Sequence, residues 1–381
     1  MTRYAVPTPA LVQRLVSLDV FRGATMAAMV IVNDPGDWNN AYWPLLHAEW
    51  NGWTPTDLIF PFFLFMVGVS MTLSRSTMGS GWKSARRGVT IMALGWFLSG
   101  FPYFPLATWR IPGVLVRIGL CYLAAVGIFR LTAPGAGRND SLHGMRLMCW
   151  VIGLTLAYWL AMVFVPYPGH NPGDLTPSGN LGAFIDRALL GQNHMWGRRP
   201  WDPEGLLSTV PAIASTLMGV VTGFWLRAPV PGGAKAMVMA AAGIAAMAIG
   251  LVWDLAFPIN KNLWTSSYAW FTGGAGAVGL AGCYWIIDVK GWRWWTKPFV
   301  VLGVNAIALF VLAGLSAKIL LLVKVGDGAG KRISLYTFTY RSWYEPFASP
   351  MNASLLFAMS YLVLLYAVLW VMYRRRIFLK V

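Results

Sequence analysis

Apolar runs of about 20 residues recur along the whole 381-residue chain, and a helix of about that length crosses the hydrocarbon core of a lipid bilayer. Hydrophobic residues make up 57% of the sequence and charged residues only 12%. A typical soluble domain carries about 25% charged residues. A chain with so few charges cannot cover its whole surface with polar groups, so it is predicted to be a multi-pass integral membrane protein.

The runs predict an all-α fold, a polytopic membrane bundle of about ten transmembrane helices. One domain is expected over residues 1–381, because no internal repeat or second soluble segment is evident. The longest outer connection, about 167–205, is rich in Pro, Gly and Asn and is expected to form a cap or substrate rim. The expected helices cover residues 16–33, 55–74, 88–107, 112–131, 146–166, 206–226, 235–257, 265–288, 298–323 and 353–373.

Lys and Arg are distributed unevenly among the connecting segments. With the N-terminus inside, the inner segments hold 18 of these residues and the outer segments hold 9. Because basic residues are retained in the cytoplasm, both termini are expected there. The same retention explains the net charge of +16 without a nucleic-acid partner. The scattered Cys121, Cys149 and Cys283 predict neither a disulfide framework nor a zinc site.

Charged residues interrupt the first apolar run, SLDVFRGATMAAMVIVND. Asp19 and Arg22 are three residues apart and share one helix face. They are expected either to form a structural ion pair or to begin a polar stripe that leads to Asn33 at the outer end. The sequence leaves both interpretations open.

The segment HAEWNGWTPTDLIFPFF places polar residues at the entrance of the second apolar run. Thr54 and Asp57 match a capping box, and Asn51-Gly52 is a turn signal. His47 fits no comparable structural pattern, so it is either a surface histidine or a catalytic one. The patterns of a metal site, a serine hydrolase and a phosphate loop do not accompany it.

Other polar residues lie near the expected outer ends of helices. Arg117 is in RIPGVLVRIGLCY, Glu204 is in WDPEG, and PINKNLWTSSY contains Lys261, Asn262 and Trp264. An interfacial aromatic anchor with helix-terminal charges explains this pattern. A sugar-binding rim also explains it, because an aromatic face beside hydrogen-bonding groups suits carbohydrate.

Several motifs, in this order, resemble those of the heparan-α-glucosaminide N-acetyltransferase family, which has bacterial members. The motifs are SLDVFRG, VND, HAEWNGWTPTDLIFPFFLFMVGVSM, RIPGVLVRIGLCY, DPEGLLSTVPAI and NKNLWTSSY. The resemblance as a whole runs from about residue 15 to 320. The chain differs from the family pattern in a longer interval between Asn33 and His47, with DPGDWNN inside it, and in Val116, where a glutamine is expected.

The resemblance implies a transmembrane acyltransferase domain, the membrane catalytic unit alone, in a bacterial plasma (inner) membrane. Cytosolic acetyl-CoA is then the co-substrate, no metal is needed, and the acceptor is the amine of an amino sugar or glycan on the far side of the bilayer. His47 is implied as catalytic, either as base or as transient acetyl carrier. Asn33 is implied at the active site and expected to stabilise the oxyanion, and Asp57 to orient the imidazole.

The complete predicted site has three parts, and phosphates of CoA are expected to bind Arg side chains. The catalytic residues are His47, Asn33 and Asp57; the acceptor-binding residues are Asn51, Arg117, Glu204, Lys261, Asn262 and Trp264; the CoA-binding residues are Arg22, Arg86 and Arg87. Two other functions remain open, a membrane transporter for N-acetylglucosamine or a related amino sugar and a non-catalytic membrane subunit. The oligomeric state is also open, with a homodimer as one alternative.

Overall fold

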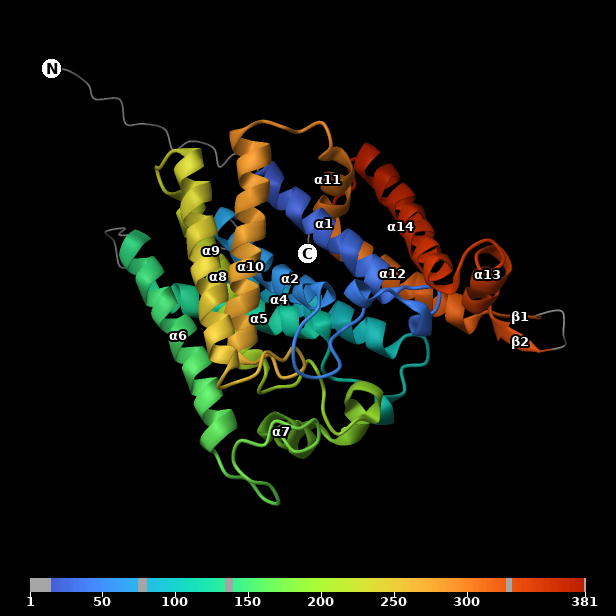
Figure 1. Cartoon of the computed structure of the whole chain (residues 1–381), viewed down its shortest axis with the longest axis horizontal. Helices are drawn as coiled ribbons and strands as arrows, with labels where there is room; N and C mark the ends of the chain where they lie inside the picture. The colour runs from blue at the N-terminus through green and yellow to red at the C-terminus, as the bar shows by residue number, and fades with distance from the viewer. Residues whose placement is uncertain (1–14, 75–80, 134–139, 327–330, 380–381) are drawn as a thin grey trace.

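The computed structural model describes residues 15–74, 81–133, 140–326 and 331–379. In this part of the chain, α-helices dominate and a single short hairpin is present (Figure 1), which confirms the predicted all-α class. Five of the basic residues behind the predicted orientation, Arg3, Arg14, Arg75, Arg138 and Lys380, lie outside the described residues. The cytoplasmic position of both termini therefore stays a prediction.

Each of the ten expected segments contains a helix, although the ends differ by several residues. The helices are α1 (Val16–Asn33), α2 (Ile59–Leu73), α4 (Gly81–Gly100), α5 (Val114–Thr132), α6 (Asp140–Phe164), α7 (Leu181–Leu190), α8 (Thr209–Arg227), α9 (Gly232–Asp254), α10 (Ser266–Tyr284), α11 (Lys297–Val304), α12 (Ala306–Leu322), α13 (Leu335–Trp343) and α14 (Pro350–Arg374). A 3-10 turn, Pro55–Leu58, leads into α2, and a π-helical turn, Trp285–Val289, extends α10. The strands β1 (Lys324–Gly326) and β2 (Arg332–Ser334) pair antiparallel.

Eight helices of the described chain are long and apolar enough to cross a membrane, and a ninth span results if α11 and α12 count as one. This number of apolar helices makes the chain a multi-pass integral membrane protein. The sequence predicted one helix over 298–323, but the structure bends it by 78° between α11 and α12. At the break, the buried Asn305 donates a hydrogen bond to the carbonyl oxygen of Ile377 and accepts one from the N–H of Leu379.

The third expected span, 88–107, is the one whose helix is not among those long and apolar enough to cross a membrane. Helix α4 begins at Gly81 and ends at Gly100 rather than covering 88–107. It includes the charged Lys83, Arg86 and Arg87 in its first half and stops before Pro102, since proline cannot continue a helical hydrogen-bond ladder. The chain therefore has eight or nine candidate spans in its described part rather than the expected ten.

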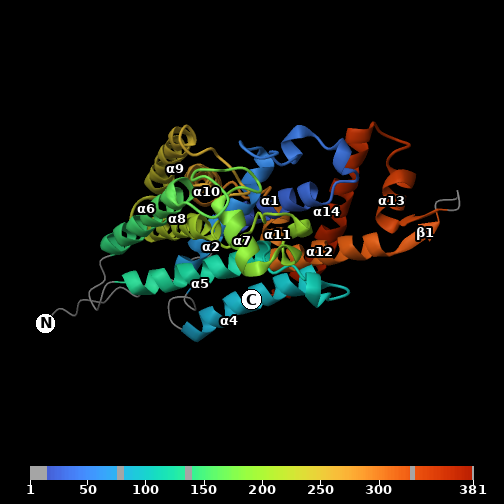
Figure 2. The same ribbon diagram turned by 90° about the horizontal axis from the view of Figure 1, so that it is seen from below.

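Glycines allow the central helices to pack with their backbones in close approach. A Cβ atom built on Gly68 of α2 would lie 1.9 Å from the carbonyl oxygen of Thr216 in α8, and one on Gly219 would lie 1.9 Å from that of Phe65. Small residues at such interfaces are common in membrane helices. Figure 2 shows α4 and α5 side by side along one face of this bundle.

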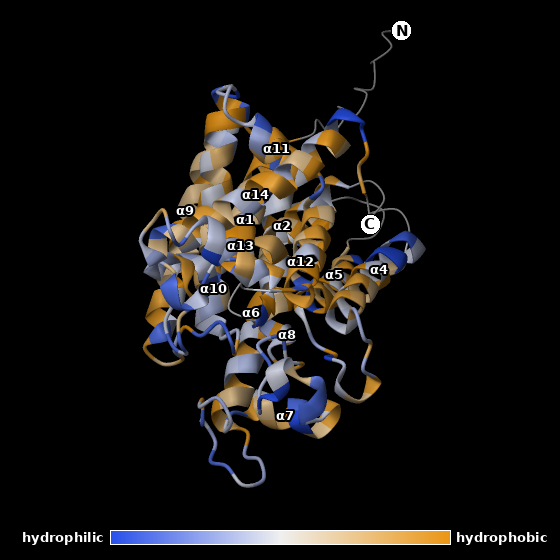
Figure 3. Ribbon diagram, turned by 90° about the vertical axis from the view of Figure 1, so that its right-hand side faces the viewer, coloured by the Kyte–Doolittle hydropathy of each residue, from blue (hydrophilic) through white to orange (hydrophobic). Residues whose placement is uncertain are grey.

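The polar parts of the chain gather in the connections between helices. Colouring by hydropathy shows apolar residues along most helices and hydrophilic ones around α7 and in loops (Figure 3). The segments 34–58, 101–113, 165–208 and 255–265 meet at one end of the bundle, joined by hydrogen bonds such as Trp50 Nε1 to the carbonyl oxygen of Leu175. Most of the predicted site residues lie at this end.

Candidate active site

The carboxylate of Asp57 connects the start of α2 to the loop that carries His47. Its Oδ2 accepts the backbone N–H groups of Thr54, at 3.0 Å, and Ala48, at 3.1 Å. The contact from Thr54 is that of the predicted capping box. The other oxygen, Oδ1, lies 2.7 Å from Nδ1 of His47. Asp57 therefore caps the helix and holds the imidazole at the same time.

This contact assigns the tautomer of His47. An ionised carboxylate only accepts hydrogen bonds, so the proton is placed on Nδ1 from the hydrogen-bond partner. Nε2 then keeps its lone pair and can accept a proton, as a general base must. The His47 side chain is 45% exposed, whereas that of Asp57 is 1% exposed. The base is thus accessible and its anchor is buried.

Lys261 joins this pair from a segment more than 200 residues away in the chain. Its Nζ lies 2.9 Å from Nδ1 and 3.1 Å from Nε2 of His47, and 3.5 Å from Oδ1 of Asp57. Burial lowers the pKa of Lys261, although the charges of Asp57 and Glu204 act to raise it. The result is a compact arrangement of an amine, an imidazole and a carboxylate.

The turn that carries Lys261 is fixed by hydrogen bonds to the His47 loop. The N–H of Gly52, whose φ of +94° confirms the predicted Asn-Gly turn, donates to the carbonyl oxygen of Ile259 at 2.7 Å. The buried Asn260 donates through Nδ2 to Oδ1 of Asn51 at 3.1 Å. Asn260 was not among the predicted site residues, and its only sequence signal was its position inside the polar PINKN stretch.

Trp264 supports this turn from inside the protein. Its side chain is 1% exposed, its Nε1 donates to the hydroxyl of Ser215 at 3.1 Å, and its ring packs edge-on against Tyr268. Its φ of +50° is costly for a bulky residue and requires strong surrounding contacts. Trp264 therefore lies behind Lys261 and does not present a face to a sugar at the surface.

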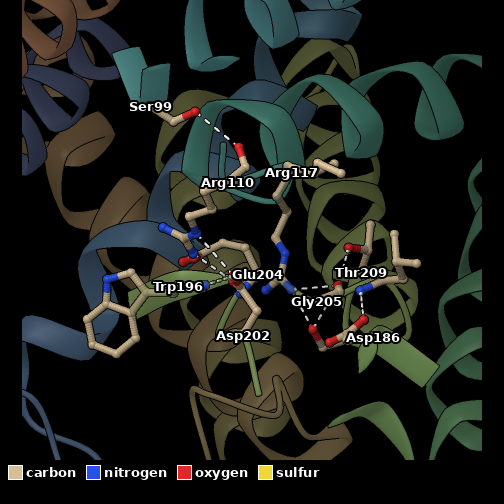
Figure 4. Close-up of polar contacts among 12 residues, drawn as sticks. Ser99, Arg110, Arg117, Asp186, Trp196, Asp202, Glu204, Gly205 and Thr209 are labelled. Carbon is tan, nitrogen blue, oxygen red and sulfur yellow. Dashed lines mark hydrogen bonds and ion pairs between the residues drawn. The ribbon is translucent and has the colours of Figure 1, made fainter. Parts of the chain in front are cut away.

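A second charged cluster joins the connection before α5 to the one before α8 (Figure 4). Arg110 contacts Asp202 through Nε at 3.0 Å and Nη2 at 2.6 Å, and Nη2 also contacts Glu204. Burial alone would lower the pKa of Arg110, but the two carboxylates outweigh it and the pKa is raised. Arg110 and Asp202 were not predicted as site residues, although Arg110 interrupts an apolar stretch.

The Arg117 side chain lies deeper in the protein than a substrate-binding side chain is expected to lie. It is 1% exposed, its Nη2 donates to the carbonyl oxygen of Gly205 at 3.0 Å and to the hydroxyl of Ser208, and its guanidinium carbon is 5.2 Å from the Trp264 ring centroid. Figure 4 shows its side chain directed towards Gly205. Arg117 therefore contacts Gly205, which follows Glu204 in the chain, and Trp264, which supports the turn of Lys261.

The predicted CoA-binding residues lie apart from this site. Arg22 forms the expected ion pair with Asp19, at 3.3 Å, and also donates to Ser70 at 2.8 Å. Arg86 is exposed on α4, and the guanidinium of Arg87 lies 5.3 Å from the Tyr122 ring centroid. Their role in binding CoA stays a prediction.

Two further predicted residues are polar and accessible. Asn33 is exposed at the C-terminal end of α1, and no hydrogen bond joins it to His47 in the described structure. Its role as an oxyanion donor stays a prediction. Asn262 is half-buried and follows Lys261 directly in the turn.

The sequence is similar to that of one family of known proteins. A family model described as "Heparan-alpha-glucosaminide N-acetyltransferase, catalytic" matches residues 14–164, which include His47 and Asp57. The chain is 31% identical to the heparan-alpha-glucosaminide N-acetyltransferase of Homo sapiens and 32% identical to that of Mus musculus. These alignments cover 79% and 78% of this chain and 53% of each relative, so the chain spans about half the length of these curated relatives. The chain is therefore similar to heparan-alpha-glucosaminide N-acetyltransferases over most of its length, and its first part matches the catalytic model of that family.

Proposed function

We propose that this chain is a membrane acetyltransferase. It transfers the acetyl group of cytosolic acetyl-CoA to the amine of an amino sugar or glycan on the extracytoplasmic side of a bacterial plasma membrane. The observation that carries this proposal is the His47–Asp57 pair, in which a buried carboxylate holds Nδ1 at 2.7 Å and Nε2, 3.1 Å from the amine of Lys261, keeps its lone pair for a proton. The names of the family relatives support the choice of reaction.

The chemistry requires a base near neutral pH. An amino sugar carries an ammonium group, which has no lone pair with which to attack a thioester. In the direct route, the ammonium first loses one proton to solvent, and Nε2 of His47 removes a second proton from the resulting amine as its nitrogen attacks the acetyl carbonyl. The carbon–sulfur bond then breaks, and the proton passes to the departing thiolate of CoA. In the alternative route, His47 first takes the acetyl group and then passes it to the amine.

Charged and hydrogen-bonding groups surround His47. Asp57 lies 3.5 Å from Lys261, and the charge of Glu204 also acts on Lys261. Asn51 and Asn262, on the two loops that meet here, can hydrogen-bond sugar hydroxyls. We assign Lys261, Glu204, Asn51 and Asn262 to acceptor binding. Asn33 is assigned to stabilising the oxyanion. Arg117 and Trp264 are proposed to support the acceptor site from the protein interior.

The donor is expected to reach the site from the opposite, basic side of the bilayer. Arg22, Arg86 and Arg87 are the proposed partners of the CoA phosphates, because guanidinium groups bind phosphate bidentately. Arg86 is exposed on α4 and is free to meet a phosphate in solution. The lipid bilayer is the remaining partner, and assembly as a homodimer is compatible with this arrangement.

The decisive assay uses labelled acetyl-CoA with a panel of amino sugars and deacetylated glycans. Purified protein in vesicles should form labelled N-acetyl product with at least one acceptor, and replacement of His47 by Ala should abolish product without loss of the folded state. Normal turnover by that variant would remove His47 from the mechanism. Absence of both CoA binding and product with every acceptor would favour a non-catalytic subunit.

A transporter for N-acetylglucosamine or a related amino sugar is the second candidate. The bend of 78° between α11 and α12 favours it, because broken helices form the substrate sites of many transporters. Uptake of labelled N-acetylglucosamine into vesicles that contain no acetyl-CoA would support transport. Product formation without uptake would support the acetyltransferase.

A further inference from the structure

The amine of Lys261 lies where an acceptor amine is needed. Its Nζ is 2.9 Å from Nδ1 and 3.1 Å from Nε2 of His47, and the second distance is within the range over which a base takes a proton from a reacting group. A glucosamine nitrogen that gives its proton to Nε2 must come equally close to the same atom. Lys261 therefore places a primary amine of this protein beside the proposed base.

We propose that Lys261 is itself an acetylation site, modified by a bound acetyl thioester when no acceptor amine is present. This inference rests on the proposed acetyltransferase function. The reaction is the proposed one with an internal acceptor, so it requires no reactant beyond acetyl-CoA.

The step balances in atoms and charge. The lone pair of neutral Nζ attacks the carbonyl carbon, a carbon–nitrogen bond forms, and the carbon–sulfur bond breaks. One amine proton passes through Nε2 of His47 to the departing thiolate. The products are Nε-acetyl-Lys261 and CoA as its free thiol.

The surroundings of Lys261 make its amine a better acceptor than that of a surface lysine. Its side chain is only 19% exposed, and burial lowers its pKa, so more of the amine is neutral at a given pH. The turn that ends at Trp264, with its φ of +50° and its buried indole, holds the start of this side chain in place. Position and protonation therefore both favour attack.

Acetylation would stop further turnover. It removes the positive charge next to the carboxylates of Asp57 and Glu204, and it leaves a neutral amide in the space in front of Nε2. A saturating acceptor would displace the Lys261 amine from Nε2 and protect it. The modified protein is thus a self-inactivated form that accumulates only when the donor is present without the acceptor.

The test incubates the purified full-length chain in detergent with ¹³C-labelled acetyl-CoA and no acceptor, and measures acetylated peptides by mass spectrometry. Lys324 is the reference within the same chain, because its Nζ donates a hydrogen bond to the carbonyl oxygen of Leu321 and its residue is exposed. Lys261 should gain label at about 100 times the rate of Lys324, as expected for a positioned general base. Addition of an effective amino sugar should slow this labelling.

Two variants make the result specific. His47→Gln should reduce labelling of Lys261 to the rate of Lys324, and Lys261→Arg should remove the labelled peptide. Equal labelling of Lys261 and Lys324 in the wild-type chain would overturn the inference, whether or not the variants fold. Undiminished labelling of Lys261 in a folded His47→Gln variant would also overturn it.

A parallel assay of N-acetyl amino-sugar product separates this inference from the proposed function. Product without preferential labelling of Lys261 would refute only the inference. Absence of product together with equal labelling of the two lysines would refute both.

Discussion

Two charged clusters lie at the same end of the helix bundle and differ in how far their side chains are exposed. In the cluster of Arg110, Asp202 and Glu204, the carboxylates are 0% and 8% exposed and the guanidinium is bound to both. In the cluster of His47, Asp57 and Lys261, the ring is 45% exposed and Lys261 contacts the other two residues. The first cluster uses its hydrogen-bonding capacity within the protein, whereas the second retains an accessible base.

This difference separates a structural role from a chemical one. A largely buried cluster in which one guanidinium binds two carboxylates holds its loops in one arrangement, and the removal of the cation leaves uncompensated charge. An exposed base with a buried anchor can exchange partners with a substrate. Glu204 connects the two clusters, since it binds Arg110 directly and its charge also acts on Lys261.

The largest expected effect is that of His47→Ala on activity. The loss of a positioned base should reduce transfer by about 10³- to 10⁴-fold, near the upper range for general base catalysis. The His47 side chain is half-exposed, so the thermal unfolding midpoint in detergent should change little. A large fall in that midpoint would instead place His47 with the structural cluster and contradict the comparison.

Arg110→Met tests the structural cluster. It leaves Asp202 and Glu204 buried without their cation, which should cost about 3–5 kcal/mol of stability. Thermal unfolding in detergent measures this loss. Arg199→Met is the matched control, because Arg199 is exposed and lies over the Trp196 ring, 4.3 Å from its centroid. That control should cost about 1 kcal/mol at most, and equal costs for both variants would refute the structural role of Arg110.

Asp57→Asn tests the connection between anchor and base. An amide must point its NH₂ either at the Nδ1–H of His47 or at the two backbone N–H groups that Oδ2 now accepts, so one set of contacts is lost. We expect about a 100-fold loss of transfer, the lower range for a positioned base, and about 1 kcal/mol of stability from the cap. Steady-state rates with labelled acetyl-CoA would show this loss, and full activity would mean that the ring needs no carboxylate.

The smallest expected effect concerns pH and Asp186, which is 3% exposed and accepts the N–H of Leu206 at 2.8 Å. Burial raises the pKa of Asp186 from 3.8 to about 6, with the charge of Asp202 adding to the rise. Between these values the folded state binds more protons than the unfolded state, so stability falls as the pH rises from about 4 to 6 and then levels off. The stability lost between pH 4 and 6 is about 2 kcal/mol.

Asp186→Asn isolates this contribution, because it keeps the acceptor oxygen and cannot ionise. The unfolding midpoint of the variant relative to wild type should rise as the pH increases from 4 to 6. A difference that does not depend on pH would show that the charge of Asp186 has no cost in the folded protein.

Local features of the fold were predictable from the sequence because they depend on neighbours in the chain. The length of the apolar runs predicted the membrane helices, and TPTD predicted the cap formed by Thr54 and Asp57. The spacing of Asp19 and Arg22 predicted that they share one helix face, and an ion pair was one of the two interpretations left open. The start of α4 was misplaced because its first half is basic and its apolar residues continue beyond Gly100, where Pro102 prevents a helix.

The sequence by itself determined three things. The chain is a membrane protein, most of its helices have definite positions along the chain, and His47 lies beside a capped helix entrance. Only the tertiary structure decided that Lys261 meets His47, that Arg110 binds Asp202 and Glu204, and that Trp264 is buried. The reason is physical. Apolar length and caps act over a few residues, whereas these contacts join segments about 90 to more than 200 residues apart, and helix packing alone brings them together.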